Sequence, residues 1–144
     1  MSELPRKFSV LGLPVHVMTN YPSWLLECLQ EGMGVHVVTL NAEMTMQAER
    51  NSSLAKVIHS AELVIPDGAG VVLYLRWLLR RKVQRTPGIE LAETLLQEIG
   101  QLGTGTKVFF YGGAPGVAAK ASEFWLSQVP GLIVAGSHSG FHSQ

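Results

Sequence analysis

The sequence predicts an α/β fold with a largely parallel sheet and helices on both of its faces. Short apolar runs rich in β-branched residues alternate along the chain with longer segments whose apolar residues recur at helical spacing. A strand, a helix and a second strand form a parallel pair, because the helix carries the chain back over the sheet. The 144 residues suffice for one domain with a core, since 47% are hydrophobic and only 15% are charged.

The first half of the chain alternates strands with helices. Residues 8–17 form an apolar run that Gly12 and Pro14 interrupt, which predicts a strand or a hairpin. Pro22 is well placed in the first turn of a helix over residues 22–32. The next predicted elements are a buried strand at 35–40, helices at 43–51 and 54–60, a short strand at 63–65 and a helix at 68–79.

The second half continues the alternation. Thr86 is a plausible N-cap, and Pro87 the first position, of a helix over residues 87–99. The remaining predicted elements are a strand at 108–111, a helix at 115–128 and a strand at 132–134. This pattern is typical of a single domain over residues 1–144 with a Rossmann-like sheet. The chain stops soon after a strand, with no helix to cover it, so we expect a truncated form of the fold.

Composition narrows the classes of protein to which the chain can belong. The 11 acidic and 11 basic residues balance, which argues against nucleic acid as a partner, because nucleic-acid binding needs a basic excess. The single cysteine, Cys28, excludes an internal disulfide and fits a reducing cytoplasm. The longest apolar region, 63–79, contains Pro66, Asp67 and Arg76 and does not read as a membrane span. We expect a cytoplasmic protein whose surface can still contact the inner face of the cell membrane.

Ligands of open α/β sheets bind beyond the carboxyl ends of the strands, so the residues there are candidates for a site. Thr39 and Asn41 alternate along an extended segment and can point the same way, toward a sugar or a phosphate. The alternative, which the segment alone favours, is that Asn41 caps the next helix.

Asp67, the only aspartate of the chain, follows a strand and opens a turn with Gly68. Its carboxylate can take a proton from an attacking hydroxyl. It can equally cap the following helix, where the free N–H groups and the dipole favour a negative charge. Spacing alone leaves the two roles balanced, and they do not exclude each other.

Gly112 and Gly113 lie between a strand and a helix. Such glycines let a diphosphate approach the N–H groups at a helix N-terminus. The glycine spacing differs from the dinucleotide-binding pattern, and many α/β proteins have a similar turn for conformational reasons alone.

Five of the 11 basic residues fall within ten positions, and they would attract a nucleotide-sugar or an anionic lipid phosphate. We interpret Arg80, Arg81 and Lys82 as a solvated helix end, and Arg85, held beside the turn at Gly88, as the better candidate for a site. His138 and His142 are separated by Gly140, which argues against a metal site. The other histidines lie in or beside apolar segments and are interpreted as structural: His16, His36 and His59.

Five of these segments, in this order and at this spacing, resemble the WecG/TagA/CpsF glycosyltransferases, which form glycosyltransferase family 26. The segments are residues 38–44, 66–72, 84–91, 111–118, and 130–132 with 136–141. The resemblance implies an inverting transferase that needs no metal or other cofactor. Its partners would be a UDP-sugar donor, such as UDP-N-acetylmannosamine, and a polyprenyl-diphosphate-linked acceptor at the membrane, in wall teichoic acid or surface polysaccharide synthesis.

The resemblance also implies roles for individual residues. Asp67 matches the general base, Thr39 and Asn41 match a polar pair, and Arg85 matches the arginine near the leaving diphosphate. The chain departs from the family pattern at Gln84, where Glu is usual, and at Glu90, where Asp is usual. It also lacks the C-terminal portion that helps to form the nucleotide pocket and meets the membrane.

Two other functions stay open from the sequence. One is a non-catalytic, truncated remnant that binds a nucleotide or a partner chain. The other is a different nucleotide-binding α/β domain, such as a dehydrogenase half, which the glycine spacing disfavours. Sheet edges left open by a missing C-terminal portion would favour a homo-oligomer.

Overall fold

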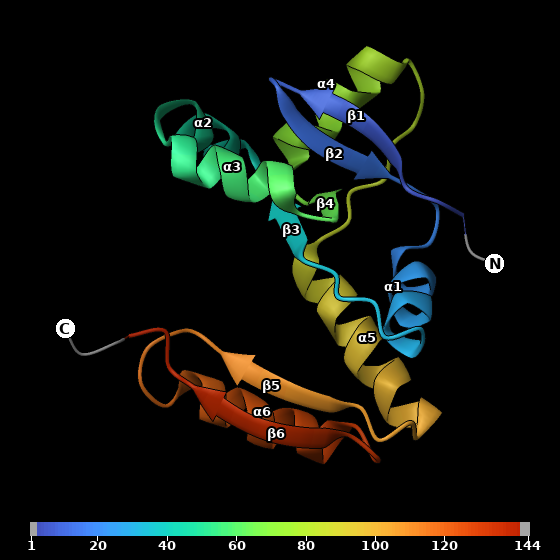
Figure 1. The fold of residues 1–144 in the computed structure, drawn as a ribbon, viewed down its shortest axis with the longest axis vertical. Helices are drawn as coiled ribbons and strands as arrows, with labels where there is room; N and C mark the ends of the chain where they lie inside the picture. The colour runs from blue at the N-terminus through green and yellow to red at the C-terminus, as the bar shows by residue number, and fades with distance from the viewer. Residues whose placement is uncertain (1–2, 142–144) are drawn as a thin grey trace. The chain divides into compact units, whose positions relative to one another are not determined.

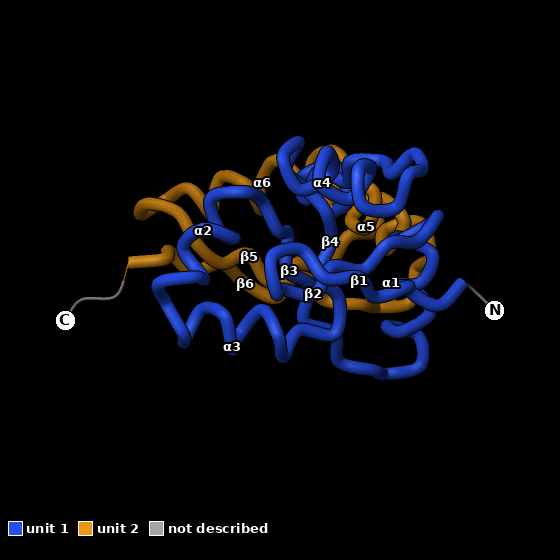
Figure 2. Tube along the Cα trace, turned by 90° about the horizontal axis from the view of Figure 1, so that it is seen from above, with its two compact units in different colours: residues 1–91 blue, residues 92–144 orange. Residues whose placement is uncertain are grey.

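The computed structural model describes residues 3–141 and divides the chain into two compact units (Figure 1). Unit 1 spans Met1–Leu91 and unit 2 spans Ala92–Gln144. Figure 2 gives each unit its own colour. The boundary falls inside helix α5 (Gly88–Leu102), so one continuous helix contributes its first turn to unit 1 and its remainder to unit 2.

Unit 1 opens with a hairpin, one of the two forms predicted for residues 8–17. Strands β1 (Arg6–Val10) and β2 (Leu13–Val17) pair antiparallel, with Val10 opposite Leu13. The two-residue loop between them has left-handed backbone angles, with φ of 48° at Leu11 and 82° at Gly12. Both angles suit the tight turn that matches the twist of paired strands, and only glycine adopts them without steric cost.

All three asparagines of the chain cap helices in unit 1. The side-chain oxygen of Asn20 accepts from the N–H of Ser23 at the start of α1 (Tyr21–Gln30). The other two asparagines do the same for α2 (Ala42–Arg50) and α3 (Ser52–Ser60). Each bond satisfies an N–H that the helix itself leaves without a partner, and this fixes where the three helices begin.

Strands β3 (Val37–Leu40) and β4 (Leu63–Pro66) form a parallel pair in unit 1. In this pair Val37 lies opposite Leu63, and Leu40 lies opposite Pro66. All of β4 is buried, which is typical of a strand covered on both faces. Helix α4 (Ala69–Leu79) follows β4 directly. The core of the unit consists of buried residues from the hairpin, β3, β4, α2, α3 and α4, including Val15, Leu40, Ile58, Val64 and Leu75.

The prediction of an α/β fold is confirmed, but the large Rossmann-like parallel sheet is not seen among the described residues. Three two-stranded sheets occur instead, one antiparallel and two parallel. One physical reason lies at the edge of β4. The N–H of Val64 donates to the imidazole Nδ1 of His16 at 2.9 Å, and Pro66 has no N–H to offer. Strand β2 therefore packs against β4 without a strand ladder between them.

Unit 2 holds the third sheet, in which β5 (Lys107–Tyr111) and β6 (Ile133–His138) run parallel. Helix α6 (Val117–Gln128) connects them and packs against both strands, as Figure 1 shows. Residues on β5 alternate between exposed and partly buried, the pattern of a strand with one covered face.

Candidate functional site

Six of the eight residues predicted for the site lie in unit 1, at the ends of β3 and β4, in the segment after α4 or at the start of α5. They are Thr39, Asn41, Asp67, Gly68, Arg85 and Gly88.

Backbone hydrogen bonds hold the two strand ends and the segment after α4 together. The carbonyl oxygen of Leu40 accepts from the N–H of Asp67 at 3.1 Å and of Gly68 at 3.3 Å. The carbonyl oxygen of Pro66 accepts from the N–H of Thr86 at 3.0 Å. The second bond ties a segment about twenty residues away in the sequence to the end of β4, which places Arg85 beside Asp67.

Asp67 and Arg85 form the charged pair of the site. The Nε of Arg85 donates to the backbone carbonyl of Asp67 at 2.6 Å, and its Nη2 lies 3.8 Å from Oδ1 of the carboxylate. The Asp67 side chain is 26% exposed and that of Arg85 is 57% exposed, so solvent or a substrate reaches both. Because the backbone anchors Arg85 at Nε, the Nη end of the guanidinium is the part that meets the carboxylate and is placed to meet an anion.

The structure bears on one of the two roles that the sequence allowed for Asp67, the capping of the next helix. Gly68 is the N-cap of α4, and no side chain provides a capping hydrogen bond there. The carboxylate therefore does not act as the helix cap and lies beside Arg85 instead. An uncapped N-terminus next to these groups leaves a partial positive charge at the strand ends.

Asn41 does cap a helix, as the segment alone favoured. Its Oδ1 accepts from the N–H of Met44 at 2.9 Å. The hydroxyl of Thr45, which is 3% exposed, donates to the backbone carbonyl of Asn41 at 2.8 Å. The sequence alone does not single out Thr45, although a hydroxyl four positions after a capping asparagine is the available signal. Together these bonds fix the turn between β3 and α2.

The two glycines of unit 1 permit close backbone approach. A Cβ at Gly68 would lie 2.9 Å from the Cβ and 3.0 Å from the Cα of Asn41. A Cβ at Gly88 would overlap the methyl group of Thr39. The first contacts involve backbone and Cβ atoms that cannot rotate away, so a side chain there would push the strand ends apart. Gly68 is therefore needed for packing at the site, Gly88 allows the close approach of the Thr39 side chain, and the contact of both glycines with a substrate remains a prediction.

The other two predicted residues, Gly112 and Gly113, belong to unit 2. Their φ angles of 121° and 71° confirm a turn that requires glycine. The N–H of Gly112 donates to the carbonyl of His138 at 2.9 Å, so it is already used within the unit. Helix α6 begins after Gly116 without a side-chain cap, and the N–H of Val117 already donates to the carbonyl of Ala114 at 3.0 Å, so only the later N–H groups of the first turn could meet an anion.

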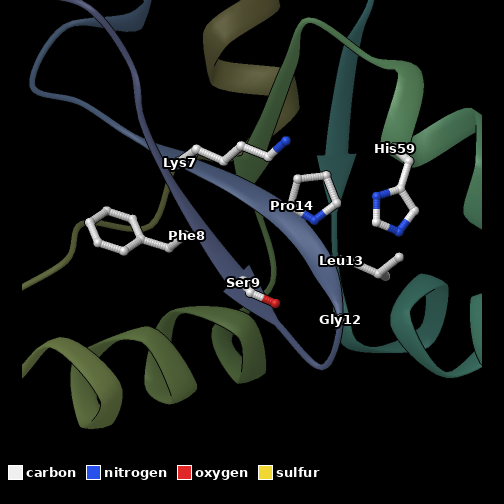
Figure 3. A pocket seen from close by; sticks show the side chains of 7 residues that line it. All are labelled: Lys7, Phe8, Ser9, Gly12, Leu13, Pro14 and His59. Atoms are coloured by element: carbon white, nitrogen blue, oxygen red, sulfur yellow. The ribbon is translucent and has the colours of Figure 1, made fainter.

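A hollow of about 280 Å³ lies elsewhere, between the hairpin and α3. Figure 3 shows Lys7 and Pro14 of the hairpin and His59 of α3 around it. None of the predicted site residues lines this hollow. Within residues 3–141, no three His, Cys, Asp or Glu side chains gather as a metal site would require, and His142 lies outside the described residues.

Most of the chain is similar to one family of known proteins. Residues 8–144 match the model of the glycosyl transferase WecG/TagA/CpsF family. One similar protein is the N-acetylglucosaminyldiphosphoundecaprenol N-acetyl-beta-D-mannosaminyltransferase of Bacillus spizizenii, 32% identical over 126 residues. The alignment covers 88% of this chain and 46% of that relative, so the chain spans about half the relative's length. The chain belongs to the WecG/TagA/CpsF glycosyltransferase family.

Proposed function

We propose that the chain is part of a glycosyltransferase that transfers N-acetylmannosamine from its UDP form to a polyprenyl-diphosphate-linked sugar, with inversion at the anomeric carbon. The product would serve surface polysaccharide or teichoic acid synthesis. Family membership supports the reaction type, and the name of the Bacillus relative supports the sugar and the acceptor class. In this proposal, residues 1–144 are the N-terminal portion of one glycosyltransferase domain.

The pairing of Asp67 with Arg85 is the observation that carries the proposal. In a single displacement, an acceptor hydroxyl attacks the anomeric carbon and the bond from that carbon to the UDP oxygen breaks. The attacking oxygen must lose its proton as it bonds to carbon. Asp67 takes this proton, because its carboxylate is reachable and is not engaged in capping α4.

Departure of UDP moves negative charge onto the diphosphate. Arg85 stabilises that charge, since its guanidinium matches phosphate oxygens and its Nε is fixed to the backbone before the substrate arrives. Fixed donors act without reorganising during the reaction, which makes them effective. In unit 2, considered by itself, the turn at Gly113 and the N-terminus of α6 are the groups that the proposal assigns to binding a diphosphate, since the N–H of Gly112 already donates to His138.

Thr39 and Asn41 orient the sugars in this scheme. Thr39 is partly buried near the end of β3 beside Gly88, and Asn41, whose Oδ1 caps α2, has its amide nitrogen at the carboxyl end of the same strand. Polar side chains on rigid elements hold the hydroxyl near the anomeric carbon, and such positioning removes part of the entropic barrier to a two-substrate reaction.

The experiment is UDP release from UDP-N-acetylmannosamine by the 144-residue chain, with and without a soluble diphospholipid-N-acetylglucosamine analogue. We expect release that requires the acceptor and that falls by roughly 100- to 10,000-fold in Asp67→Asn, the range of a lost general base. Glu49→Gln on the exposed face of α2 removes one acidic charge away from the site and should retain the rate.

A folded Asp67→Asn variant that releases UDP at the original rate would remove Asp67 as the base. A folded chain that binds UDP, measured by calorimetric titration, but releases none would favour the non-catalytic nucleotide-binding function. Preference for NAD over UDP in the same titration would favour a different nucleotide-binding domain.

A further inference from the structure

Helix α4 carries an exposed apolar stripe next to a group of cations. Its inner face, Val71, Val72 and Leu75, is buried in the core of unit 1. On its outer face, Leu73 is 68% exposed and Trp77 is 73% exposed, and the spacing of four residues places them one turn apart. The nearby cations lie in the last turn and the segment after it: Arg76, Arg80, Arg81 and Lys82.

The fold holds these cations in place. Arg76 donates from Nε to the carbonyl of Val83 at 2.9 Å, which folds the segment after α4 back along the helix. Arg80 ends the helix in a left-handed conformation, with φ of 49°. The guanidinium of Arg81 lies 6.0 Å from the ring centroid of Phe8 on β1. Arg76 and Arg81 are thus held by contacts within unit 1, Arg76 and Arg80 border the same hollow as Trp77, and Lys82 follows them as an exposed cation.

The same stretch contains no balancing acid. No Asp or Glu occurs between Asp67 and Glu90, while five cations occur there. Glu3 is near enough for Arg81 to help lower its pKa, but the main cause is hydrogen bonding, because its carboxylate accepts from the hydroxyl of Thr19 at 2.7 Å and from the N–H of the same residue. The surface beside Trp77 is therefore apolar and positively charged at once.

We propose that the outer face of α4 docks on an anionic lipid bilayer. Leu73 and Trp77 enter the boundary between headgroups and acyl chains, where an indole ring is favoured, and the arginines and Lys82 meet lipid phosphates. A protein partner that covered this face would have to bury several cations, which is unfavourable unless it supplies matching acids. No helix in the described part of the chain is long and apolar enough to cross a bilayer.

This proposal is independent of the sugar transfer proposed above, and its test uses no sugar. The 144-residue chain is sedimented with phosphatidylcholine vesicles with and without one third phosphatidylglycerol. We expect binding to the anionic vesicles, weakened when NaCl rises from about 0.1 M to about 1 M, because the Debye length falls from about 10 Å to about 3 Å. The emission of Trp77 should shift to shorter wavelength on binding, and this shift should be absent in Trp77→Phe.

Two double variants, which remove the same number of positive charges, test which surface of the chain binds the vesicles. Arg81→Gln with Lys82→Gln should weaken binding about 30-fold, since each cation near an anionic surface contributes about fivefold. Arg50→Gln with Lys56→Gln removes the same charge from α2 and α3 and should change binding little. Circular dichroism establishes that each variant is folded, and the salt series tests the wild-type chain without any substitution.

Equal binding to neutral and anionic vesicles, or no binding by the folded chain, would overturn the proposal. So would equal losses in the two double variants. A dimer seen by light scattering without lipid, and dispersed by Trp77→Glu, would show instead that a second copy of the chain covers this face.

Discussion

The two parallel strand pairs of the molecule have the same topology but very different surroundings. In unit 1, every residue of β4 is buried, and Leu63, Val64 and Ile65 are 0% exposed. In unit 2, Phe109 and Tyr111 of β5 are 56% and 62% exposed within the described structure. Helices and the hairpin enclose the first pair, whereas α6 covers one face of the second.

This difference in burial explains which strand pair can keep the side chains of a site in fixed positions by itself. The strand ends of the β3–β4 pair are fixed by a closed core, by the bonds of Leu40 and Pro66, and by the Asp67–Arg85 pair. The turn after β5 is held by the backbone bonds of Gly112 and Gly113 to the end of β6. Rigid packing sets side-chain positions, so we expect the chemistry at β4 and a more accommodating, backbone-based contact at β5.

The largest expected loss of stability comes from a substitution in the core of unit 1. Ile65→Ala removes three buried carbon atoms and leaves a cavity, which should lower the free energy of unfolding by about 2–5 kcal/mol. Phe109→Ala on β5 removes a larger but half-exposed ring and should lower it by only about 1 kcal/mol. Urea unfolding followed by circular dichroism measures both. If Phe109→Ala is the more damaging of the two, the difference drawn between the strand pairs is wrong.

A smaller effect is expected at the glycine beside the site. Gly88→Ala places a methyl group against the side chain of Thr39 and should destabilise the fold by about 1–3 kcal/mol, because the strand end must shift. Gly34→Ala is the matched control, since a Cβ there meets nothing within 4 Å and the φ angle is not left-handed. Thermal unfolding compares the two variants. Equal melting temperatures would mean that β3 accommodates the extra methyl group.

The smallest expected loss of stability occurs as pH falls, and it arises at the edge of β4. Burial, assisted by Lys7, lowers the pKa of His16 below its ordinary value of 6.5. The ring also accepts the Val64 N–H at Nδ1, a bond that the doubly protonated ring cannot make. As pH falls below 6.5, the unfolded chain binds a proton before the folded chain does, so this contribution to stability is fully present above pH 6.5 and is lost toward the lower folded pKa.

The measurement is urea unfolding of the wild-type chain and of His16→Gln at several pH values between 5 and 8, a range in which other histidines titrate equally in both proteins. The wild-type chain should lose more stability than the variant as pH falls, by an amount on the order of one hydrogen bond, about 1 kcal/mol. Parallel curves for the two proteins would mean that His16 is not the group responsible.

The sequence alone determined the local features of this protein. Turn residues and apolar periodicity predict the hairpin and the order of helices and strands, and a polar residue directly after a strand marks Asp67 as a candidate. These signals act within a few residues, where backbone preference and side-chain spacing decide the outcome. The observed strand β6 extends to His138, beyond the predicted end at residue 134, because the segment with Gly136 and Ser137 gains its strand form from pairing with β5 rather than from its own preference.

The tertiary structure decided what depends on residues far apart in the chain. Arg85 anchors to the carbonyl of Asp67 across 18 positions, and His16 caps the edge of β4 across 48. The first bond sets the carboxylate beside a guanidinium rather than at a helix cap, and the second limits the predicted parallel sheet on that side. Neither follows from local spacing, because each exists only when the folded backbone brings two separate segments within hydrogen-bond distance.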